Sequence, residues 1–398
     1  MQSISDATAT ELAERVRVFQ DEFVSPSEDS YLAGGESQML AMARLRSEAR
    51  TRDLWNLCLS GTEWGRGLTN LQYAPIAELT GRTLGGAEAL NCDGPDSVNM
   101  ETLLTFGTSE QKEVWLRPLA EGSVRSCFAM TEPDVASSDA SNIATSFTRK
   151  GNEFVISGRK WWSSGAAHPE CAFALTMGVS GPDESRYHRH SILIVPMDSP
   201  GVTIARELTA FGYGHGAAEI IFDEVVVPVE NLLGGEGSGF AVAQSRLGPA
   251  RIQHCMRLIG MAERALEMMC ARARVRRTFG VDLVDRETVR DWIAESRLRI
   301  EQARLLVLAT AKHVDENGVR DARRDISLIK VAVPRMACWI LDRAIQVHGA
   351  AGVTDDLPLA TMYVRARTLQ IADGPDEVHN MVIARSELGK STTSPAIS

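Results

Sequence analysis

The chain of 398 residues lacks four features that would each indicate a class of protein. Its seven cysteines are scattered and never form Cys-x-x-Cys, so a disulfide framework or zinc site is not expected and a reducing compartment is. The eight histidines show no ligand spacing either, so no metal is expected. No apolar run reaches the ~20 residues that a membrane span needs. A net charge of −10 argues against nucleic acid as a main partner, because phosphate binding needs a basic surface.

The two ends of the chain carry no targeting signal that the sequence makes recognisable. Residues 1–22 predict an acidic amphipathic helix, which lacks the apolar core of a secretory signal and is too acidic for a transit peptide. The last five residues do not match the peroxisomal address. We therefore expect a cytoplasmic protein.

The local patterns divide the chain into a helical domain at 1–125, a β-domain at 126–235, a helical bundle at 236–390 and a disordered tail at 391–398. This length exceeds a single hydrophobic core, so several subdomains are expected. Within the first domain, Thr108-Ser-Glu-Gln111 is a capping box that predicts the start of a helix. Strands are predicted where β-rich runs lie between turn residues, at 153–157, 172–177, 191–195, 202–205, 218–222 and 225–227.

After the glycine-rich stretch 234–239 the pattern becomes helical again. Residues at alternating four- and three-residue steps indicate the seam of a bundle: Val289, Ile293, Ser296, Ile300, Ala303 and Val307. Helices are expected at about 240–278, 285–316, 323–348, 357–370 and 376–388.

Two polar segments, 128–139 and 160–165, each combine hydroxyl groups, backbone donors and an aromatic between apolar, strand-like sequences. That combination suits a flat heterocycle with hydrogen-bonding edges better than it suits a metal or a peptide. The alternative is a pair of serine- and threonine-rich β-loops without a ligand.

Phe128-Ala-Met-Thr-Glu-Pro and Lys160-Trp-Trp-Ser-Ser-Gly resemble the flavin-cradling segments of the acyl-CoA dehydrogenase family. The resemblance covers about residues 50 to 388 and implies a mainly α fold with an inserted β-domain and FAD as cofactor. It implies that Phe128, Met130 and Thr131 serve the pyrimidine edge of the flavin, that Trp162 forms its wall, and that Ser164 approaches N5. The loop after Pro133 is one residue longer than the family's, and Ser138 is the better candidate to face cofactor and substrate.

Two further motifs resemble the family's contacts with the diphosphate end of FAD. Arg276-Arg-Thr-Phe-Gly280 resembles Arg-x-Thr-Phe-Gly, which implies FAD contacts for Arg276, Thr278 and Phe279; a guanidinium fork suits phosphate oxygens. The run 346–352 resembles Gln-x-x-Gly-Gly-x-Gly, a loop that in the family contacts the FAD of a neighbouring subunit. It implies cofactor contacts for Gln346, Gly349 and Ala350, and a homo-oligomer, either a dimer or a homotetramer built as a dimer of dimers.

Two residues in this part of the sequence depart from the family's pattern. Ala350 replaces the second glycine of the loop, which can hinder close approach of the backbone. Glu287 stands where the family usually has glutamine, which would put a carboxylate near the diphosphate.

Aligning Ala372-Asp-Gly-Pro-Asp-Glu-Val-His379 to the family's catalytic segment puts Asp373 where the family has a glutamate before glycine. Oxidation of an acyl thioester at Cα–Cβ needs a carboxylate within hydrogen-bond reach of the α-proton. Because aspartate is one methylene shorter, the backbone must lie about 1.5 Å closer to the substrate. The alternative is that Asp373 caps a helix. Asp376 and Glu377 are the next candidates for the base; Gly374 is expected beside the substrate, and Pro375 and Glu377 beside FAD.

Arg246 and Arg251 match the place where the family has an arginine near the pantetheine tunnel, and Gly248-Pro-Ala-Arg251 is expected to head a helix. His254 lies one turn further. The run 247–257 resembles the branch of the family whose eukaryotic members are fused to a kinase-like domain.

The sequence therefore predicts an FAD-dependent α,β-dehydrogenase of acyl-CoA in fatty acid metabolism, with an electron-transferring flavoprotein or oxygen as acceptor. Three alternatives stay open. One is a nitroalkane-oxidising flavoenzyme, since aspartate also serves as base in such relatives. Another is a dehydrogenase of an acyl group bound to a carrier protein. The third is a flavin-binding scaffold without catalysis.

Overall fold

The computed structural model describes residues 4–389, so the predicted disordered tail at 391–398 lies outside the described residues. The chain divides into two compact units. Unit 1 comprises residues up to 76 and 85–250, and unit 2 comprises residues 77–84 and those from 251 onward. Helices α4 (Asn70–Gly81) and α9 (Gly239–Val275) contribute to both units. The three domain boundaries predicted above remain a prediction, because unit 1 groups the first helices with the sheet.

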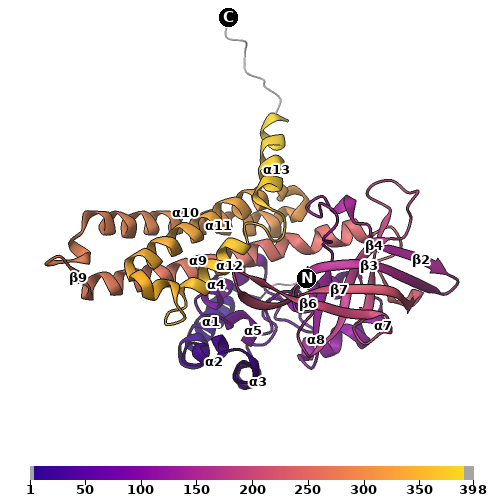
Figure 1. Cartoon of the computed structure of the whole chain (residues 1–398), viewed down its shortest axis with the longest axis horizontal. Coiled ribbons are helices and arrows are strands. Elements are labelled where there is room, and N and C mark those ends of the chain that lie inside the picture. Colours follow the sequence, from indigo (N-terminus) through magenta and orange to yellow (C-terminus); the bar gives the residue numbers. More distant parts are fainter. Residues whose placement is uncertain (1–3, 390–398) are drawn as a thin grey trace, which may run out of the picture. The chain divides into compact units, whose positions relative to one another are not determined.

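Unit 1 begins with helices, as predicted (Figure 1). Helix α1 starts after Ser5, whose hydroxyl accepts a hydrogen bond from the amide of Thr8 at 3.2 Å, and it buries Leu12, Val16 and Phe19. The capping box is confirmed, since Thr108 and Gln111 cap each other reciprocally. Besides α4, the α-helices before the sheet are α1 (Asp6–Phe19), α2 (Glu28–Leu32), α3 (Gly35–Thr51), α5 (Gly86–Ala89), α6 (Asp96–Phe106), α7 (Ser109–Gln111) and α8 (Arg117–Glu121).

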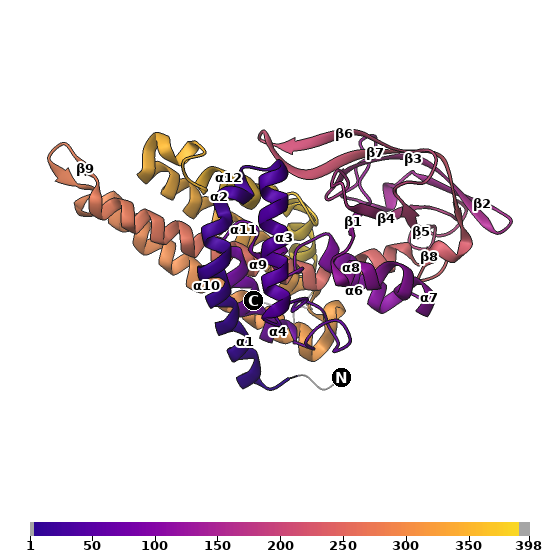
Figure 2. The same cartoon turned by 90° about the horizontal axis from the view of Figure 1, so that it is seen from below.

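Eight strands of unit 1 form one mixed sheet in the order β6-β7-β3-β2-β4-β5-β8, with β1 added beside β4 in parallel (Figure 2). Every predicted strand run lies in one of these strands, although 218–222 and 225–227 form a single strand, β7. The strands are β1 (Arg125–Ala129), β2 (Ser146–Lys150), β3 (Glu153–Ser163), β4 (Cys171–Val179), β5 (His190–Pro196), β6 (Val202–Ala210), β7 (Tyr213–Pro228) and β8 (Leu232–Leu233).

Six consecutive residues of strand β4, 173–178, are buried. Because successive side chains of a strand point to opposite sides, β4 is buried on both faces. Phe173, Leu175 and Met177 join a core with Met100 and Leu103 of α6. Ala174 faces a second core formed with residues of β3 and β7. Strand β1 pairs with β4 in parallel, so this buried strand positions the polar segment that begins at Phe128.

Unit 2 is helical apart from the short hairpin β9 (Arg277–Thr278) and β10 (Val281–Asp282). Helix α11 packs against α10, α12 and α13. Helices α11 and α13 begin and end where predicted, and all predicted seam residues of α10 are buried except half-buried Ile293. The helices are α10 (Glu287–Asp321), α11 (Arg323–His348), α12 (Leu359–Thr368) and α13 (Asp376–Leu388).

Helix α9 corrects one prediction: Gly248-Pro-Ala-Arg251 does not head a helix but lies inside one. Pro249 removes one backbone donor from the helix without ending it. Further along, the helix crosses α4 at close range within unit 2. A Cβ on Gly260 would lie 1.9 Å from the carbonyl oxygen of Glu78, so only glycine fits there. The fold class is confirmed: helices, then a sheet, then a helical bundle.

Candidate active site

The two polar segments meet in unit 1, where β1 ends beside the last residues of β3. The amide of Trp161 donates to the carbonyl of Thr131 at 3.0 Å, and the Thr131 hydroxyl donates to the carbonyl of Trp161 at 2.7 Å. Two segments 30 residues apart are therefore joined by a reciprocal pair of hydrogen bonds. The Thr131 oxygen keeps its lone pairs, so it can still accept from a ligand.

A buried ion pair, which sequence reasoning did not identify, locks this junction. The Lys160 ammonium donates to the carbonyl of Met130 at 2.9 Å and to Glu132 at 2.8 Å. Glu132 also accepts from the amides of Ala144 and Thr145 and from the Thr145 hydroxyl. Burial lowers the pKa of Lys160 to about 8, against the pull of Glu132. Burial would raise the pKa of Glu132, but Lys160 and these hydrogen bonds bring it below its usual value. Both groups are therefore charged at neutral pH.

Trp162 lies on a β-bulge. Lys160 pairs with Ile220 and Ser163 with Ala218, so two residues of β3 face a single residue of β7. At this bulge Trp162 has a φ of 52°, which is unusual for a bulky residue, and it is 44% exposed. Ser163 is buried and Ser164 exposed, so Ser164 is the serine available to a ligand.

The loop after Pro133 separates the roles of its two serines. Ser137 closes the loop: its hydroxyl accepts from the amide of Glu132 at 2.8 Å and lies 3.2 Å from the Glu132 carbonyl. Ser138 is exposed. The serine chosen from the sequence is thus the one whose side chain faces outward.

Arg246 lies over the ring of Phe128, with its guanidinium carbon 3.7 Å from the ring centroid. It donates to the amide oxygen of Asn99 at 3.2 Å, and Asn99 donates to the hydroxyl of Ser126 at 2.9 Å. Asp96 accepts from that same hydroxyl at 2.7 Å. A buried polar chain from α6 thus supports both Arg246 and the strand that carries Phe128.

In unit 2, Asp373 and Gly374 form a turn in which both residues have positive φ, 56° and 98°. Aspartate tolerates this conformation better than most residues. Position 374 favours glycine because a side chain at φ 98° would be strained, and a Cβ there would lie 3.0 Å from Nε2 of His379. Arg251 donates from Nε at 3.0 Å and from Nη2 at 2.7 Å to the Asp373 carbonyl, and Lys330 lies 3.3 Å from the Gly374 carbonyl. Cations thus hold the main chain of this turn.

The Asp373 side chain lies beside His254 of α9, with 3.5 Å between Oδ2 and Nε2. Helix α13 has Pro375 as its N-cap residue, so the alternative in which Asp373 caps this helix does not describe the turn. Of the next candidates for the base, Asp376 is buried and accepts from Arg335 at 2.7 Å, whereas Glu377 is exposed on α13.

His379 packs under the same turn, with Nε2 3.3 Å from the Asp373 carbonyl and Nδ1 3.2 Å from the Ser327 hydroxyl. Burial, together with Arg251 and Lys330, lowers the pKa of His379 to about 4. Burial likewise lowers the pKa of Lys330 and of Arg251. The environment of Asp373 therefore combines cations with a neutral imidazole at neutral pH.

The residues predicted for the diphosphate end lie at the surface of unit 2. Phe279 has a φ of 49° at the tip of the β9–β10 hairpin and its side chain is fully exposed. Thr278 accepts from Arg286 through its carbonyl at 2.6 Å, and Arg276 is exposed. Glu287 is the exposed first residue of α10.

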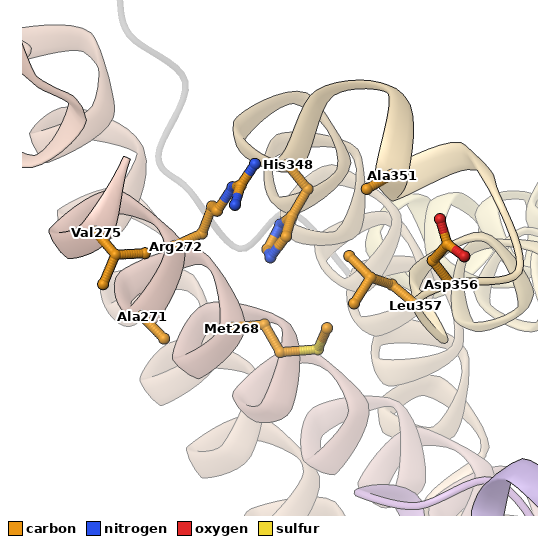
Figure 3. A pocket seen from close by; sticks show the side chains of 8 residues that line it. All are labelled: Met268, Ala271, Arg272, Val275, His348, Ala351, Asp356 and Leu357. Atoms are coloured by element: carbon orange, nitrogen blue, oxygen red, sulfur yellow. The ribbon is translucent and has the colours of Figure 1, made fainter. Parts of the chain in front are cut away.

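The predicted loop after α11 adjoins a pocket of about 480 Å³ (Figure 3). Gln346, Gly349 and Ala350 are exposed here. Arg272 and His348 line the pocket, and among residues 4–389 the buried Nε of Arg272 has no hydrogen-bond partner. An unsatisfied guanidinium nitrogen beside a cavity fits a phosphate-bearing ligand.

Within residues 4–389 no helix is long and apolar enough to cross a membrane. The same residues contain no group of three or more His, Cys, Asp or Glu side chains that could hold a metal ion.

The chain matches three family models along its length: "Acyl-CoA dehydrogenase, N-terminal domain" at residues 6–123, "middle domain" at 127–225 and "C-terminal domain" at 237–388. The chain therefore belongs to the acyl-CoA dehydrogenase family, as its sequence predicted. Members of this family are FAD-dependent oxidoreductases that act on CH–CH donors, and the chain is an enzyme of this class.

Among its relatives, a probable acyl-CoA dehydrogenase FadE2 of Mycobacterium tuberculosis is 50% identical over 403 residues, covering 98% of each chain. Acyl-CoA dehydrogenase family member 11 of Gallus gallus is 50% identical over 94% of this chain, which spans half of that protein's length. It represents the eukaryotic branch that the sequence resembled. The structure of a putative acyl-CoA dehydrogenase from Mycobacterium abscessus has a TM-score of 0.94 at 47% identity, covering 98% of this chain and 100% of that one.

Proposed function

We propose that the protein oxidises an acyl-CoA to the α,β-unsaturated thioester and that Asp373 removes the α-proton. The observation that carries this proposal is the Asp373 turn: Arg251 donates twice to its carbonyl, while its carboxyl stays partly exposed on a residue of positive φ. A carboxylate held this way needs little reorganisation to accept a proton.

The residues of unit 1 suit the flavin ring of FAD. The exposed Trp162 offers an aromatic wall, Ser164 and the Thr131 oxygen offer hydrogen bonds, and the Lys160–Glu132 pair holds the main chain between them. In unit 2, Arg272 with its unsatisfied Nε, His348 and the loop at Gly349 suit phosphate. Bound FAD would supply the acceptor for the hydride that leaves Cβ.

Asp373 would take the proton of Cα as the thioester is oxidised. Arg246 and Arg251 are proposed to bind the pantetheine part of the substrate, and Ser138 and Gly374 to contact the substrate as well. The residues proposed to contact the cofactor are Phe128, Met130, Pro375 and Glu377. The first of these arginines is held by Asn99, whereas Arg251 already binds the Asp373 turn. Any contact of Arg251 with the substrate would therefore be made while Arg251 also holds the Asp373 carbonyl.

Acyl-CoA substrates and an electron-transferring flavoprotein are typical of the family. We propose this acceptor, with oxygen as the alternative, and a homo-oligomer in which the exposed Gln346–Ala350 loop and Phe279 reach the cofactor of a neighbouring subunit. A cytoplasmic location and a role in fatty acid metabolism are part of the same proposal.

The test is anaerobic flavin reduction by a panel of acyl-CoAs, with nitroalkanes and an acyl-carrier-protein thioester included. The FAD-loaded protein should bleach with one or more acyl-CoAs, and Asp373→Asn should slow bleaching by about 10²–10⁴-fold while keeping its flavin. Asp321→Asn, an exposed carboxylate at the end of α10, is the matched control.

Each alternative has its own outcome in this experiment. Bleaching by nitroalkanes alone would indicate a nitroalkane-oxidising flavoenzyme. Bleaching by the carrier-protein thioester alone would indicate a dehydrogenase of carrier-bound acyl groups. A protein that binds FAD but is reduced by none of these compounds would be a scaffold. Full activity in Asp373→Asn would show that another group is the base.

A further inference from the structure

His254 lies one turn after Arg251 on helix α9, so both side chains reach the Asp373 turn from one face of the helix. Arg251 contacts the main chain of Asp373 and His254 contacts its carboxyl. The two residues thus act on different parts of Asp373: one fixes the backbone and the other meets the reactive group.

The distance of 3.5 Å between His254 Nε2 and Asp373 Oδ2 is short enough for a charge on the imidazole to change the basicity of the carboxylate. Both side chains are about a quarter exposed, at 22% and 24%, so protons can be exchanged with solvent. A histidine with this contact and this access is suited to exchange a proton with the carboxyl near neutral pH.

We propose that His254 is the positioning and proton-accepting partner of Asp373, an inference that rests on the proposed function. When the substrate is oxidised, the Cα–H bond breaks, its electron pair enters the new Cα–Cβ double bond, and its proton joins the Asp373 carboxylate. Bound FAD would supply the acceptor for the hydride that leaves Cβ. Neutral His254 then accepts the proton from the Asp373 carboxyl through Nε2, which restores the carboxylate, and releases it to solvent.

The protonation of His254 then sets the rate in a definite direction. An imidazolium beside Asp373 stabilises the carboxylate and weakens it as a base, and it has no free nitrogen to accept a proton. Loss of that proton at higher pH strengthens the base and opens the transfer. The rate of α-proton removal should therefore rise as pH rises through the titration of His254.

Within residues 4–389, the charged or titratable groups that are seen to act on this turn do not predict such a rise in rate with pH. On α9, Arg251 is a guanidinium, and burial raises the pKa of Cys255 to about 12. On α13, His379 has its pKa near 4 and Asp376 is paired with Arg335. On α11, Lys330 donates to the carbonyls of Leu369 and Gly374, and the positive charge of Arg323 adds to the lowering of the Arg251 pKa.

The experiment measures the rate of anaerobic flavin reduction against pH for the FAD-loaded wild type, His254→Gln and His313→Gln. His313 is the control because it forms another His–Asp pair in unit 2, 2.7 Å from Asp325. As pH rises through the titration of His254, the wild type and His313→Gln should gain about tenfold in rate, the effect of a one-unit change in the pKa of the base. His254→Gln should show no such rise. An unchanged rise in His254→Gln would overturn the proposal.

A second measurement does not depend on turnover. Proton-detected NMR of the FAD-loaded protein with labelled histidine should place the titration midpoint of the His254 ring at lower pH in Asp373→Asn than in the wild type, because a negative neighbour is removed. An unmoved midpoint would refute the pair. If no acyl-CoA reduces the wild type, the proposed function fails, and this midpoint still decides whether the two side chains are coupled.

Discussion

The Thr131–Trp162 region of unit 1 and the Asp373–Gly374 turn of unit 2 use the same device for different ends. In unit 1, Lys160 donates to the carbonyl of Met130, and in unit 2, Arg251 and Lys330 donate to the carbonyls of Asp373 and Gly374. Each region also contains a non-glycine residue of positive φ, Trp162 in unit 1 and Asp373 in unit 2. In unit 1 the cation also has a carboxylate partner, Glu132, which is fully engaged in hydrogen bonds. In unit 2 the carboxylate sits on the turn itself and lies beside a histidine.

The difference shows which carboxylate is structural and which is suited to react. Glu132 is buried and anchored by four donors, so it shapes the loop that carries Thr131. Asp373 is partly exposed, and its backbone rather than its carboxyl carries the anchoring bonds from Arg251. The comparison can be tested by changing the anchoring cation in each region in turn.

The largest effect is expected in unit 1. Lys160→Met leaves Glu132 buried without its counter-charge and should reduce the free energy of unfolding by about 3–5 kcal/mol. Urea unfolding of the variant measures this, with Lys150→Met on the exposed end of β2 as the control. The double variant Lys160→Met with Glu132→Gln should recover part of the loss, because it no longer buries a lone charge. Wild-type stability in Lys160→Met alone would show that the ion pair does not hold the junction.

The next effect is expected in unit 2, on rate rather than on stability. Arg251→Lys keeps a positive charge but replaces two hydrogen bonds with one, so the Asp373 turn loosens. A charge-assisted hydrogen bond contributes about 1.5–3 kcal/mol, so flavin reduction should slow by about 10–100-fold without loss of FAD. Arg264→Lys is the control, because Arg264 also lies on α9 and donates to a main-chain carbonyl, that of Arg82. An unchanged rate in Arg251→Lys would mean that the fork is not needed to present the carboxylate.

The third effect concerns acid. Because His379 has a pKa of about 4 in the folded protein and about 6.5 when unfolded, the unfolded chain binds more protons between these values. The free energy of unfolding should therefore fall as pH falls through this window, and His379→Gln should make the fall less steep. Urea unfolding at several pH values measures the slope, and His188→Gln, at an exposed histidine, is the control. An identical slope in both variants would exclude His379 as the cause.

The sequence predicted the parts of this site that depend on local pattern. Helices α11 and α13 begin and end as expected, and the segments at 128–131 and 160–164 could each be matched to a flavin segment of the family because each carries its own motif. The bulge at Trp162 could not be predicted, since it exists only relative to the partner strand β7. The long helix expected at about 240–278 is α9, but the expectation that Gly248-Pro-Ala-Arg251 heads a helix was wrong, because α9 continues through Pro249.

The unpredicted contacts are those between residues far apart in the chain. Lys160 and Glu132 are 28 residues apart, and Arg251 meets a carbonyl 122 residues away. Arg251 was assigned to substrate from its motif alone, and its hold on Asp373 came only from the structure. His254 was visible one turn along, but only its distance from Asp373 gives it a chemical role.

The most direct test of the central claim, that Asp373 removes the α-proton, separates proton removal from oxidation. A slowly oxidised acyl-CoA carrying deuterium at Cα is incubated anaerobically with the FAD-loaded protein, and loss of deuterium to water is followed by mass spectrometry. The wild type should exchange the label and Asp373→Asn should not, with flavin content equal in both. Exchange at the wild-type rate in Asp373→Asn would contradict the assignment of Asp373 as the base.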